Sequence, residues 1–348
     1  MASFSRMVVV LVGALTWSAC TSQTTLRRQY VESVRDQRQG LHDDAREGYE
    51  SILTASPGFE GARNNLAVLA IADGQATAAL KLLRQELQAY PTQRSARLNE
   101  VLLLLAGDDN AAAIRASRAL LGSFAGDPVA HLLHGVALLR TRSDNDEAIR
   151  VLTEALKADV SSVRARAAFA RGVANARGTH WAAAAEDFGT AARLRRDAVA
   201  HFNRALSLVH TDDLAGAQEA LGHSAALDDR AAAVPHLLAI VQHRRGDPKA
   251  AHASVERARK QEPSRPGLSL LLGVIHYQAG AFDQATAAFL AETSITPASA
   301  AAWFDLGMAR LEGEDLRAAH DAFATAASLA PDDKAAAHNR DTLLKLIE

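Results

Sequence analysis

The sequence has one cysteine among 348 residues, only 5% aromatic residues and almost no net charge. A single cysteine excludes an internal disulfide and a cysteine-rich zinc site. A formal net charge of -2 provides no basic field, so we expect no nucleic-acid partner. Hydrophobic residues nevertheless reach 48% of the chain. Small aliphatic residues, mainly alanine, must therefore fill the core, and this composition favours helix over strand.

Catalytic motifs are also missing. The sequence contains no H-E-x-x-H, no G-x-S-x-G, no phosphate-binding G-x-x-x-x-G-K and no dinucleotide fingerprint. Acidic pairs such as Asp108 and Asp109, or Asp332 and Asp333, lie in predicted turns, where their side chains cap the next helix. We therefore expect neither enzymatic activity nor a cofactor.

A period of 34 residues runs through the C-terminal third of the chain. It separates Pro263, Pro297 and Pro331. The same spacing relates Ala251, Ala285 and Ala319. A fixed period of this length is typical of an array of helical repeats, in which each unit buries its apolar face only against its neighbours.

Within the best unit, the apolar residues form two helical stripes. Trp303 and Leu306 are three residues apart on the first helix, and Phe323 lies on the second. Small residues at Gly307 and Ala319 allow the two backbones to approach closely, and we expect Phe323 to fill the space beside them. Pro331 ends the second helix. Each unit is thus predicted to be a two-helix hairpin.

These residues give the family resemblance. The order Trp303, Leu306, Gly307, then Ala319, Phe323, Ala326 and Pro331 is similar to the tetratricopeptide repeat (TPR) pattern W-x2-L-G-x2-Y, A-x3-F-x2-A and Pro. The resemblance implies an all-α, right-handed superhelix of stacked hairpins. Projected along the chain, the register predicts nine units and a capping helix at 334–348. The units are 26–59, 60–93, 94–127, 128–164, 165–197, 198–231, 232–265, 266–299 and 300–333.

The fourth unit departs from the period by about three residues. One extra residue lies in the turn from Thr141 to Asp146, and two lie near Val160 to Ser162. Because extra residues between helices change the local superhelical angle, we expect a kink or an altered groove there. We expect the array as a whole to be a single domain.

The amino terminus resembles an export signal. Arg6 precedes an apolar run from Met7 to Trp17, which is too short to cross a bilayer but sufficient for a signal peptide at 1–19. Ser18 and Ala19 before Cys20 resemble the lipobox of bacterial lipoproteins, although Trp17 stands where the lipobox prefers Leu. The resemblance implies a lipid on Cys20, a linker at 20–25 and an outer-membrane location facing the periplasm. The alternative is ordinary cleavage nearby, which would leave Cys20 as a free thiol.

An apolar stripe is expected on the concave face. In TPR proteins the first helix of each unit lines the groove, and the ninth position is apolar in all nine units here. The stripe would accept an amphipathic helix or an extended peptide of a protein partner. In the alternative, the superhelix buries the stripe within itself. The candidate groove residues are Leu98, Leu102, Leu105, Leu132, Val136, Leu139, Phe169, Val173, Phe202, Leu206, Ile240, Tyr277, Phe304 and Met308.

Histidines raise the question of a metal. His131 and His134 occupy packing positions of the repeat, which favours an interior role. His210, His236 and His243 could converge in the groove, but no carboxylate is placed to complete a metal shell. Solvated or partner-contacting imidazoles are the alternative, and we expect no metal.

The sequence thus predicts a membrane-anchored scaffold that binds envelope proteins. Its layout resembles that of TPR lipoproteins in pilus and secretin assembly and of adaptors for peptidoglycan enzymes. The resemblance to the assembly lipoproteins predicts support for a pilus, secretin or motility machine. The resemblance to the adaptors predicts a non-catalytic adaptor of a peptidoglycan enzyme. A receptor or carrier for a small ligand, such as a glycan or an acyl chain, is the other alternative.

Overall fold

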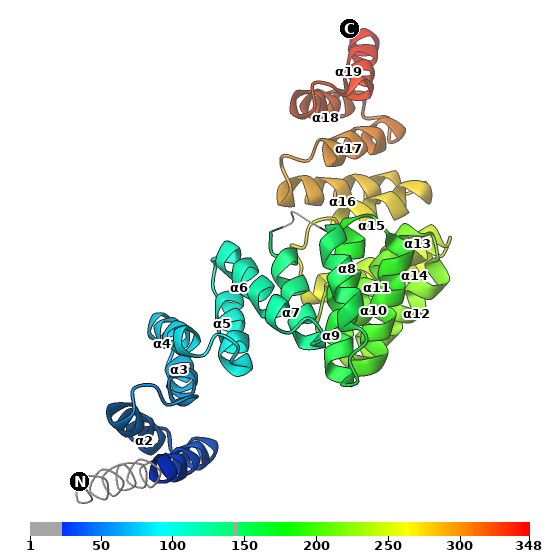
Figure 1. The fold of residues 1–348 in the computed structure, drawn as a ribbon. Coiled ribbons are helices and arrows are strands. Elements are labelled where there is room, and N and C mark those ends of the chain that lie inside the picture. The colour runs from blue at the N-terminus through cyan, green and yellow to red at the C-terminus, as the bar shows by residue number, and fades with distance from the viewer. Residues whose placement is uncertain (1–22, 142–144) are drawn as a thin grey trace, which may run out of the picture. The chain divides into compact units, whose positions relative to one another are not determined.

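The computed structural model describes residues 23–141 and 145–348, and all its regular elements are helices (Figure 1). The predicted all-α fold is confirmed. Successive helices are joined by short turns, and consecutive helices contact each other from α2 to α8 and again from α10 to α19. The pairs are residues 23–38 with α2 (His42–Ala55), α3 (Ala62–Ala72) with α4 (Ala76–Ala89), α5 (Arg94–Ala106) with α6 (Asn110–Ser123), α7 (Pro128–Leu139) with α8 (Asn145–Ala155), α9 (Ser161–Arg177) with α10 (Trp181–Arg195), α11 (Ala198–His210) with α12 (Leu214–Leu227), α13 (Ala233–Arg244) with α14 (Pro248–Gln261), α15 (Leu268–Gln278) with α16 (Phe282–Ile295), and α17 (Ala300–Glu312) with α18 (Leu316–Leu329), and α19 (Lys334–Ile347) follows.

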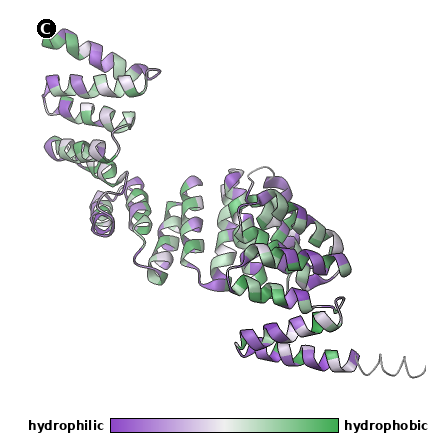
Figure 2. Ribbon diagram, turned by 90° about the vertical axis from the view of Figure 1, so that its left-hand side faces the viewer, coloured by the Kyte–Doolittle hydropathy of each residue, from purple (hydrophilic) through white to green (hydrophobic). Residues whose placement is uncertain are grey.

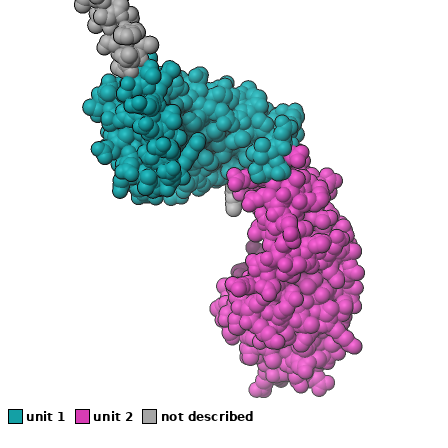
Figure 3. Space-filling model, turned by 90° about the horizontal axis from the view of Figure 1, so that it is seen from below, with its two compact units in different colours: residues 1–163 teal, residues 164–348 magenta. Residues whose placement is uncertain are grey.

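The chain divides into two compact units, residues 1–163 and 164–348 (Figure 3). The boundary falls inside α9, beside the irregular fourth repeat. Each unit has its own buried core of small residues and leucines. Along most helices, hydrophobic and hydrophilic residues alternate with the helical period, as Figure 2 shows.

Close packing inside the last two hairpins depends on a glycine. A Cβ atom at Gly307 would lie 2.8 Å from the ring of Phe323, which is fully buried. The same pairing joins Gly273 to Phe289, where the distance would be 2.4 Å. Real Cβ atoms essentially never approach so closely, so only glycine lets the aromatic ring cover the first helix. The predicted role of Gly307 and Phe323 is therefore seen directly.

In each of two hairpins, a buried glutamate on the second helix accepts hydrogen bonds from the start of the first helix. Glu86 on α4 accepts a hydrogen bond from the backbone N–H of Gly61, before α3, at 2.6 Å. Glu292 on α16 binds the N–H groups of Gly267 and Leu270, at the start of α15, at 2.9 and 3.3 Å. Both carboxylates thus satisfy unpaired donors at a helix N-terminus and complement its positive end. In these two hairpins, the end of the second helix is therefore held against the start of the first helix.

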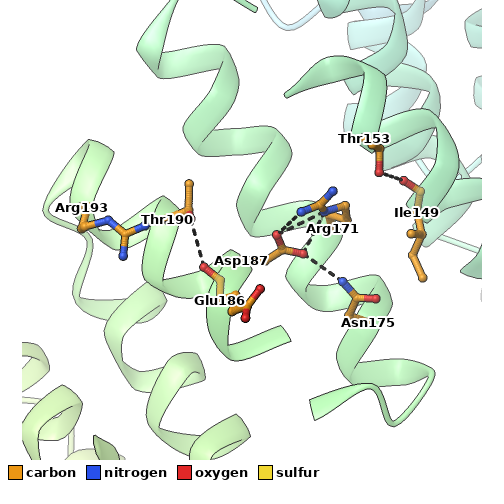
Figure 4. A network of polar contacts seen from close by, with 8 residues as sticks. All are labelled: Ile149, Thr153, Arg171, Asn175, Glu186, Asp187, Thr190 and Arg193. Atoms are coloured by element: carbon orange, nitrogen blue, oxygen red, sulfur yellow. Dashed lines mark hydrogen bonds and ion pairs between the residues drawn. The ribbon is translucent and has the colours of Figure 1, made fainter. Parts of the chain in front are cut away.

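A third hairpin holds an ion pair between its helices (Figure 4). Arg171 on α9 donates to both carboxylate oxygens of Asp187 on α10, with the shortest contact, from Nη2 to Oδ1, at 2.6 Å. Asn175, one turn along α9, donates to Asp187 Oδ2 at 2.9 Å. In Figure 4 the Asp187 carboxylate points between these two side chains, whereas Glu186 points away from them. The buried carboxylate of Asp187 is therefore fully engaged by α9.

Arginines link one repeat to the next. Arg140, at the end of α7, donates to the backbone oxygens of Leu105 and Gly107 at the end of α5. Arg244, at the end of α13, donates to the Val209 oxygen at 3.1 Å and to Asp212 at 2.7 Å. A cation placed at the last carbonyls of a helix complements its negative end. Both arginines occupy the same place in their repeats and bind the preceding first helix.

The turn between the two helices contains a left-handed residue in seven of the repeats that the structure describes. Glycine supplies it in four repeats, at Gly40, Gly74, Gly246 and Gly280. Elsewhere the same place is taken by Thr179, Asp212 and Glu314, with φ between 60° and 63°. A side chain in this conformation costs about 1 kcal/mol or more. At these three positions the geometry of the repeat therefore imposes a left-handed conformation that the residue itself disfavours.

Three expectations about boundaries differ from the structure. Residues 23–25, assigned to a linker, are helical because no proline or glycine interrupts the segment before Gly40. α9 begins at Ser161, so residues 161–164, assigned to the fourth repeat, belong to the first helix of the fifth. The amphipathic spacing of the capping helix predicts that Leu343, Leu344 and Ile347 face the last repeat. In α19, Leu343 is buried and Ile347 packs beside it, but Leu344 is 44% exposed. The cap thus contacts the last repeat through fewer residues than expected.

Candidate functional site

The ninth position of each repeat presents an apolar side chain that is never fully buried. Leu102 is 51% exposed and Leu206 is 36% exposed, and the other seven side chains are partly exposed. These seven are Val34, Val68, Val136, Val173, Ile240, Val274 and Met308. Interior helix positions of this kind are normally either buried or polar. The first helices of both units therefore carry an accessible row of apolar side chains.

The other candidate groove residues differ in accessibility. Leu98, Leu105, Phe169, Phe202, Tyr277 and Phe304 are partly exposed. Leu132 and Leu139 are buried and do not line a surface. Both lie on α7, where eight of the 12 residues are buried, because α7 is packed on more than one side. These two leucines are core residues, contrary to the expectation.

Two of the aromatic candidate groove residues each pack against the ring of a buried phenylalanine. Phe169 meets Phe188 with ring centroids 5.4 Å apart, and Phe304 meets Phe323 at the same separation, both edge to face. Edge-to-face contacts hold a ring in one orientation. Phe169 and Phe304 therefore present fixed apolar surfaces next to the ninth-position residues Val173 and Met308.

A polar network occupies the start of the array. The Asn65 side-chain amide donates to the hydroxyls of Tyr30 and Tyr49 at 3.0 and 3.1 Å, and Tyr49 donates to Gln37 at 2.8 Å. Asn99 on α5 donates to Asn64 on α3 at 2.9 Å. The side-chain amides of Asn64, Asn65 and Asn99 are thus bound within this network. Sequence reasoning did not find this network, although paired asparagines on an apolar helix are its signal.

The side chains Ser117, His134 and Glu147 have the residue types of a nucleophile, a base and an orienting acid. Ser117 Oγ lies 3.0 Å from His134 Nδ1, and His134 Nε2 lies 3.6 Å from a Glu147 oxygen. Ser117 and His134 are buried, so no substrate reaches the hydroxyl. The contact between α6, α7 and α8 is structural. His134 is an interior histidine, as its packing position indicated.

The three histidines considered for a metal are used separately. The His210 ring stacks on Trp181 with centroids 3.9 Å apart, and His236 accepts a hydrogen bond from Arg265 at 3.2 Å. His243 is partly exposed on α13. Across residues 23–141 and 145–348, no group of three potential ligands from His, Cys, Asp and Glu could hold a metal ion. The described structure thus gives His210, His236 and His243 separate surroundings and does not bring them together as a set of ligands.

One buried histidine and three partly buried histidines are expected to make the fold sensitive to acid. Burial is the main cause that lowers the pKa of His134, His201, His236 and His276 below its usual value. Neighbouring Arg118 and Arg150 also lower the pKa of His134, whereas Glu147 opposes them. The unfolded chain then binds more protons than the folded chain as pH falls below about 6.5. We expect the free energy of unfolding, measured by urea denaturation, to decrease between pH 7.5 and 5.5.

Two carboxyl groups change the stability in the opposite direction as pH falls. A single histidine variant is therefore needed to isolate the contribution of one imidazole. Burial raises the pKa of Glu86 and Asp305, so their protonation favours the folded state at low pH. His134→Gln removes one imidazole and is expected to reduce the loss of stability between pH 7.5 and 5.5. An unchanged loss in this variant would show that His134 is protonated in the folded protein.

The proposed signal peptide and Cys20 lie outside the described residues. No helix of the described part of the chain is long and apolar enough to span a membrane. The structure therefore leaves the predicted lipid anchor untested.

Comparison with solved structures places the chain among helical repeat proteins. The C-terminal part of a TPR repeat-containing protein from Cytophaga hutchinsonii matches with 12% identity and a TM-score of 0.56, over 70% of this chain and 99% of that one. The Pseudomonas aeruginosa pilF structure matches with 19% identity and a TM-score of 0.50, over 64% and 95% of the two chains. A chain of the APC/C hetero-tetramer Cut9-Hcn1 matches with 15% identity and a TM-score of 0.50, over 87% of this chain. This chain spans only 59% of the length of that one.

The family follows from the sequence comparison. No curated protein matches the chain. A family model described as tetratricopeptide repeat matches residues 32–94, 138–192 and 236–300, together more than half of the sequence. These segments include repeats at the beginning, middle and end of the helical array. The chain therefore belongs to the tetratricopeptide repeat family.

Proposed function

We propose that this protein is a non-catalytic scaffold that binds protein partners through the apolar ninth-position residues of its first helices. TPR domains generally bind proteins, and the family membership provides that prior. The observation that carries the proposal is the exposure of Leu102 on α5 and Leu206 on α11. Apolar side chains repeated along an accessible face are typical of surfaces that receive a peptide or an amphipathic helix.

Charges introduced on this face are expected to abolish partner binding without unfolding the protein. In Leu102→Glu with Leu206→Glu, a partner would have to bury two carboxylates, which costs several kcal/mol. Photo-crosslinking in cells from Met308, followed by mass spectrometry, should then yield about tenfold less partner. Circular dichroism should be unchanged, because both leucines are already exposed.

The matched control carries the same charge change on second helices. Leu227 on α12 and Leu290 on α16 are 39% and 45% exposed, so Leu227→Glu with Leu290→Glu should retain the partner. Loss of helical signal in the first double variant would show that the row is core. Equal loss of partner in both double variants would remove the argument for the first helices.

We further propose that the protein is exported and held by lipid at Cys20 on a bacterial outer membrane, facing the periplasm. The apolar run Met7 to Trp17 and the small residues before Cys20 support this proposal. The resemblance in layout to TPR lipoproteins of pilus and secretin assembly supports a role in assembling an envelope machine. Several acyl chains on one residue would anchor the scaffold firmly.

Cys20→Ala is expected to move the protein from the membrane fraction to the soluble fraction. The described helices offer no membrane span of their own, so the lipid would be the main attachment. Fractionation followed by immunoblotting measures the distribution. Metabolic labelling with a palmitate analogue should mark the parent protein and not the variant. Unchanged sedimentation together with absent labelling of the parent would reject the anchor.

A further inference from the structure

A pocket of about 330 Å³ opens between the first helices of the last two repeats. Val274, Tyr277 and Gln278 of α15 line one side, and Asp305 and Met308 of α17 line the other. Phe289 of α16, which is buried, forms the floor. All these helices lie in the same compact unit, and α17 contacts both α15 and α16. The pocket is therefore a defined cavity within the row of ninth-position residues Val274 and Met308.

Asp305 is the one carboxyl among the residues that line this pocket, and no counter-charge from the described part of the chain acts on it. Burial alone raises the pKa of its carboxyl group, with no contribution from a hydrogen bond or a neighbouring charge. Arg310, on the next turn of α17, instead donates to the Ala318 oxygen at 3.1 Å. A partly buried carboxylate without a partner is costly, and a cation that binds it recovers that cost. The described part of the fold thus leaves Asp305 for an external group.

We propose that this pocket binds the basic side chain, arginine or lysine, of an apolar segment of the protein partner. The inference rests on the proposed function, because it assigns one contact within the row of first-helix residues. It adds a charge requirement that the apolar row alone does not impose.

The lining suits such a side chain along its whole length. The aliphatic stem of arginine or lysine packs against apolar side chains such as Val274 and Met308 while its head reaches a carboxylate. The Tyr277 ring is held edge to face by Phe282, with centroids 5.6 Å apart, and provides a face for a cation. Gln278 at the rim offers an amide oxygen to the remaining N–H groups.

Other occupants fit less well. A purely apolar side chain would bury Asp305 further without neutralising it. An acidic group would meet both Asp305 and Glu312, whose charges already raise the pKa of Tyr277, although burial is the larger cause. The charge and the shape of the pocket therefore both select a cation on an apolar stem.

Selection from a random peptide library displayed on phage tests the inference. The immobilised protein is expected to enrich peptides that carry arginine or lysine flanked by apolar residues. For the best peptide, replacing the basic residue by citrulline or norleucine should weaken binding about tenfold or more in fluorescence anisotropy. With Asp305→Asn, the original peptide and its citrulline analogue should bind within about twofold of each other.

The control is Asp332→Asn, which makes the same charge change at an exposed turn outside the pocket. This variant should keep the preference for the basic residue. Enrichment of apolar peptides without a basic residue, or an unchanged preference in Asp305→Asn, would overturn the inference and leave the proposed scaffold intact. If no peptide is enriched at all, the proposed function fails with it.

Discussion

Asp187→Ala is expected to lower the free energy of unfolding by about 3 kcal/mol. The substitution removes three hydrogen-bonded contacts from Arg171 and one from Asn175. The donors that bound Asp187 then lose this acceptor inside the α9–α10 hairpin. The Arg171 side chain is 26% exposed, against 5% for Asp187, so part of the guanidinium still reaches water. We therefore expect the lower end of the range for a broken buried ion pair.

Urea denaturation followed by circular dichroism measures this loss. Glu186→Ala is the matched control, because Glu186 is the preceding residue of α10 and is exposed. It should change stability by less than about 0.5 kcal/mol. Asp187→Asn keeps the shape and one acceptor oxygen and should fall between the two. Similar stabilities of the two alanine variants would show that water or rearrangement replaces the contacts of Asp187.

The sequence pattern was sufficient to predict the helical hairpins, because the period constrains them repeatedly. Each hairpin needs a small residue opposite a large one, as at Gly307 and Phe323, and the spacing of such pairs is visible without coordinates. The start of α9 was misplaced for the opposite reason. No proline or glycine marks the junction near Val160, so nothing in the residues showed that the helix begins at Ser161.

The polar contacts inside the hairpins could not be predicted from the period, because they occur in single repeats. Glu86 and Gly61 are 25 residues apart, and their contact depends on how the end of α4 reaches the start of α3. An acidic residue on an inward-facing stripe is a usable signal, since burying one requires a partner. Asp187, which directly precedes the packing residue Phe188, gives that signal in the sequence.

The candidate surface was only partly predictable, because accessibility depends on the neighbours of each helix. Leu102 and Leu132 were assigned to the same face by repeat position, yet one is 51% exposed and the other is buried. α5 leaves one side open, whereas α7 is covered on more than one side. Asp305 could be assigned no role in the sequence, because its significance depends on the lack of a cation around it.

Phe323→Ala is expected to lower the free energy of unfolding by about 3 to 5 kcal/mol. The ring is fully buried between α17, α18 and α19, where it packs with Leu343 and meets Phe304 edge to face. Truncation loses this burial and leaves a cavity beside Gly307 that small neighbours cannot fill. Leu329→Ala on the same helix is the control, because Leu329 is 40% exposed and should cost less than about 1 kcal/mol.

Gly307, which lies against the Phe323 ring, allows a test in which the effect of one substitution on stability changes sign. Gly307→Ala places a Cβ atom 2.8 Å from the ring in the parent protein, and the overpacking should destabilise it by about 1 to 3 kcal/mol. In the Phe323→Ala background the ring is absent, so only the better helix propensity of alanine, about 1 kcal/mol, remains. Gly307→Ala should then stabilise the protein, as urea denaturation of all four proteins would measure. A destabilisation of equal size in both backgrounds would mean that the glycine is required by the backbone and not by Phe323.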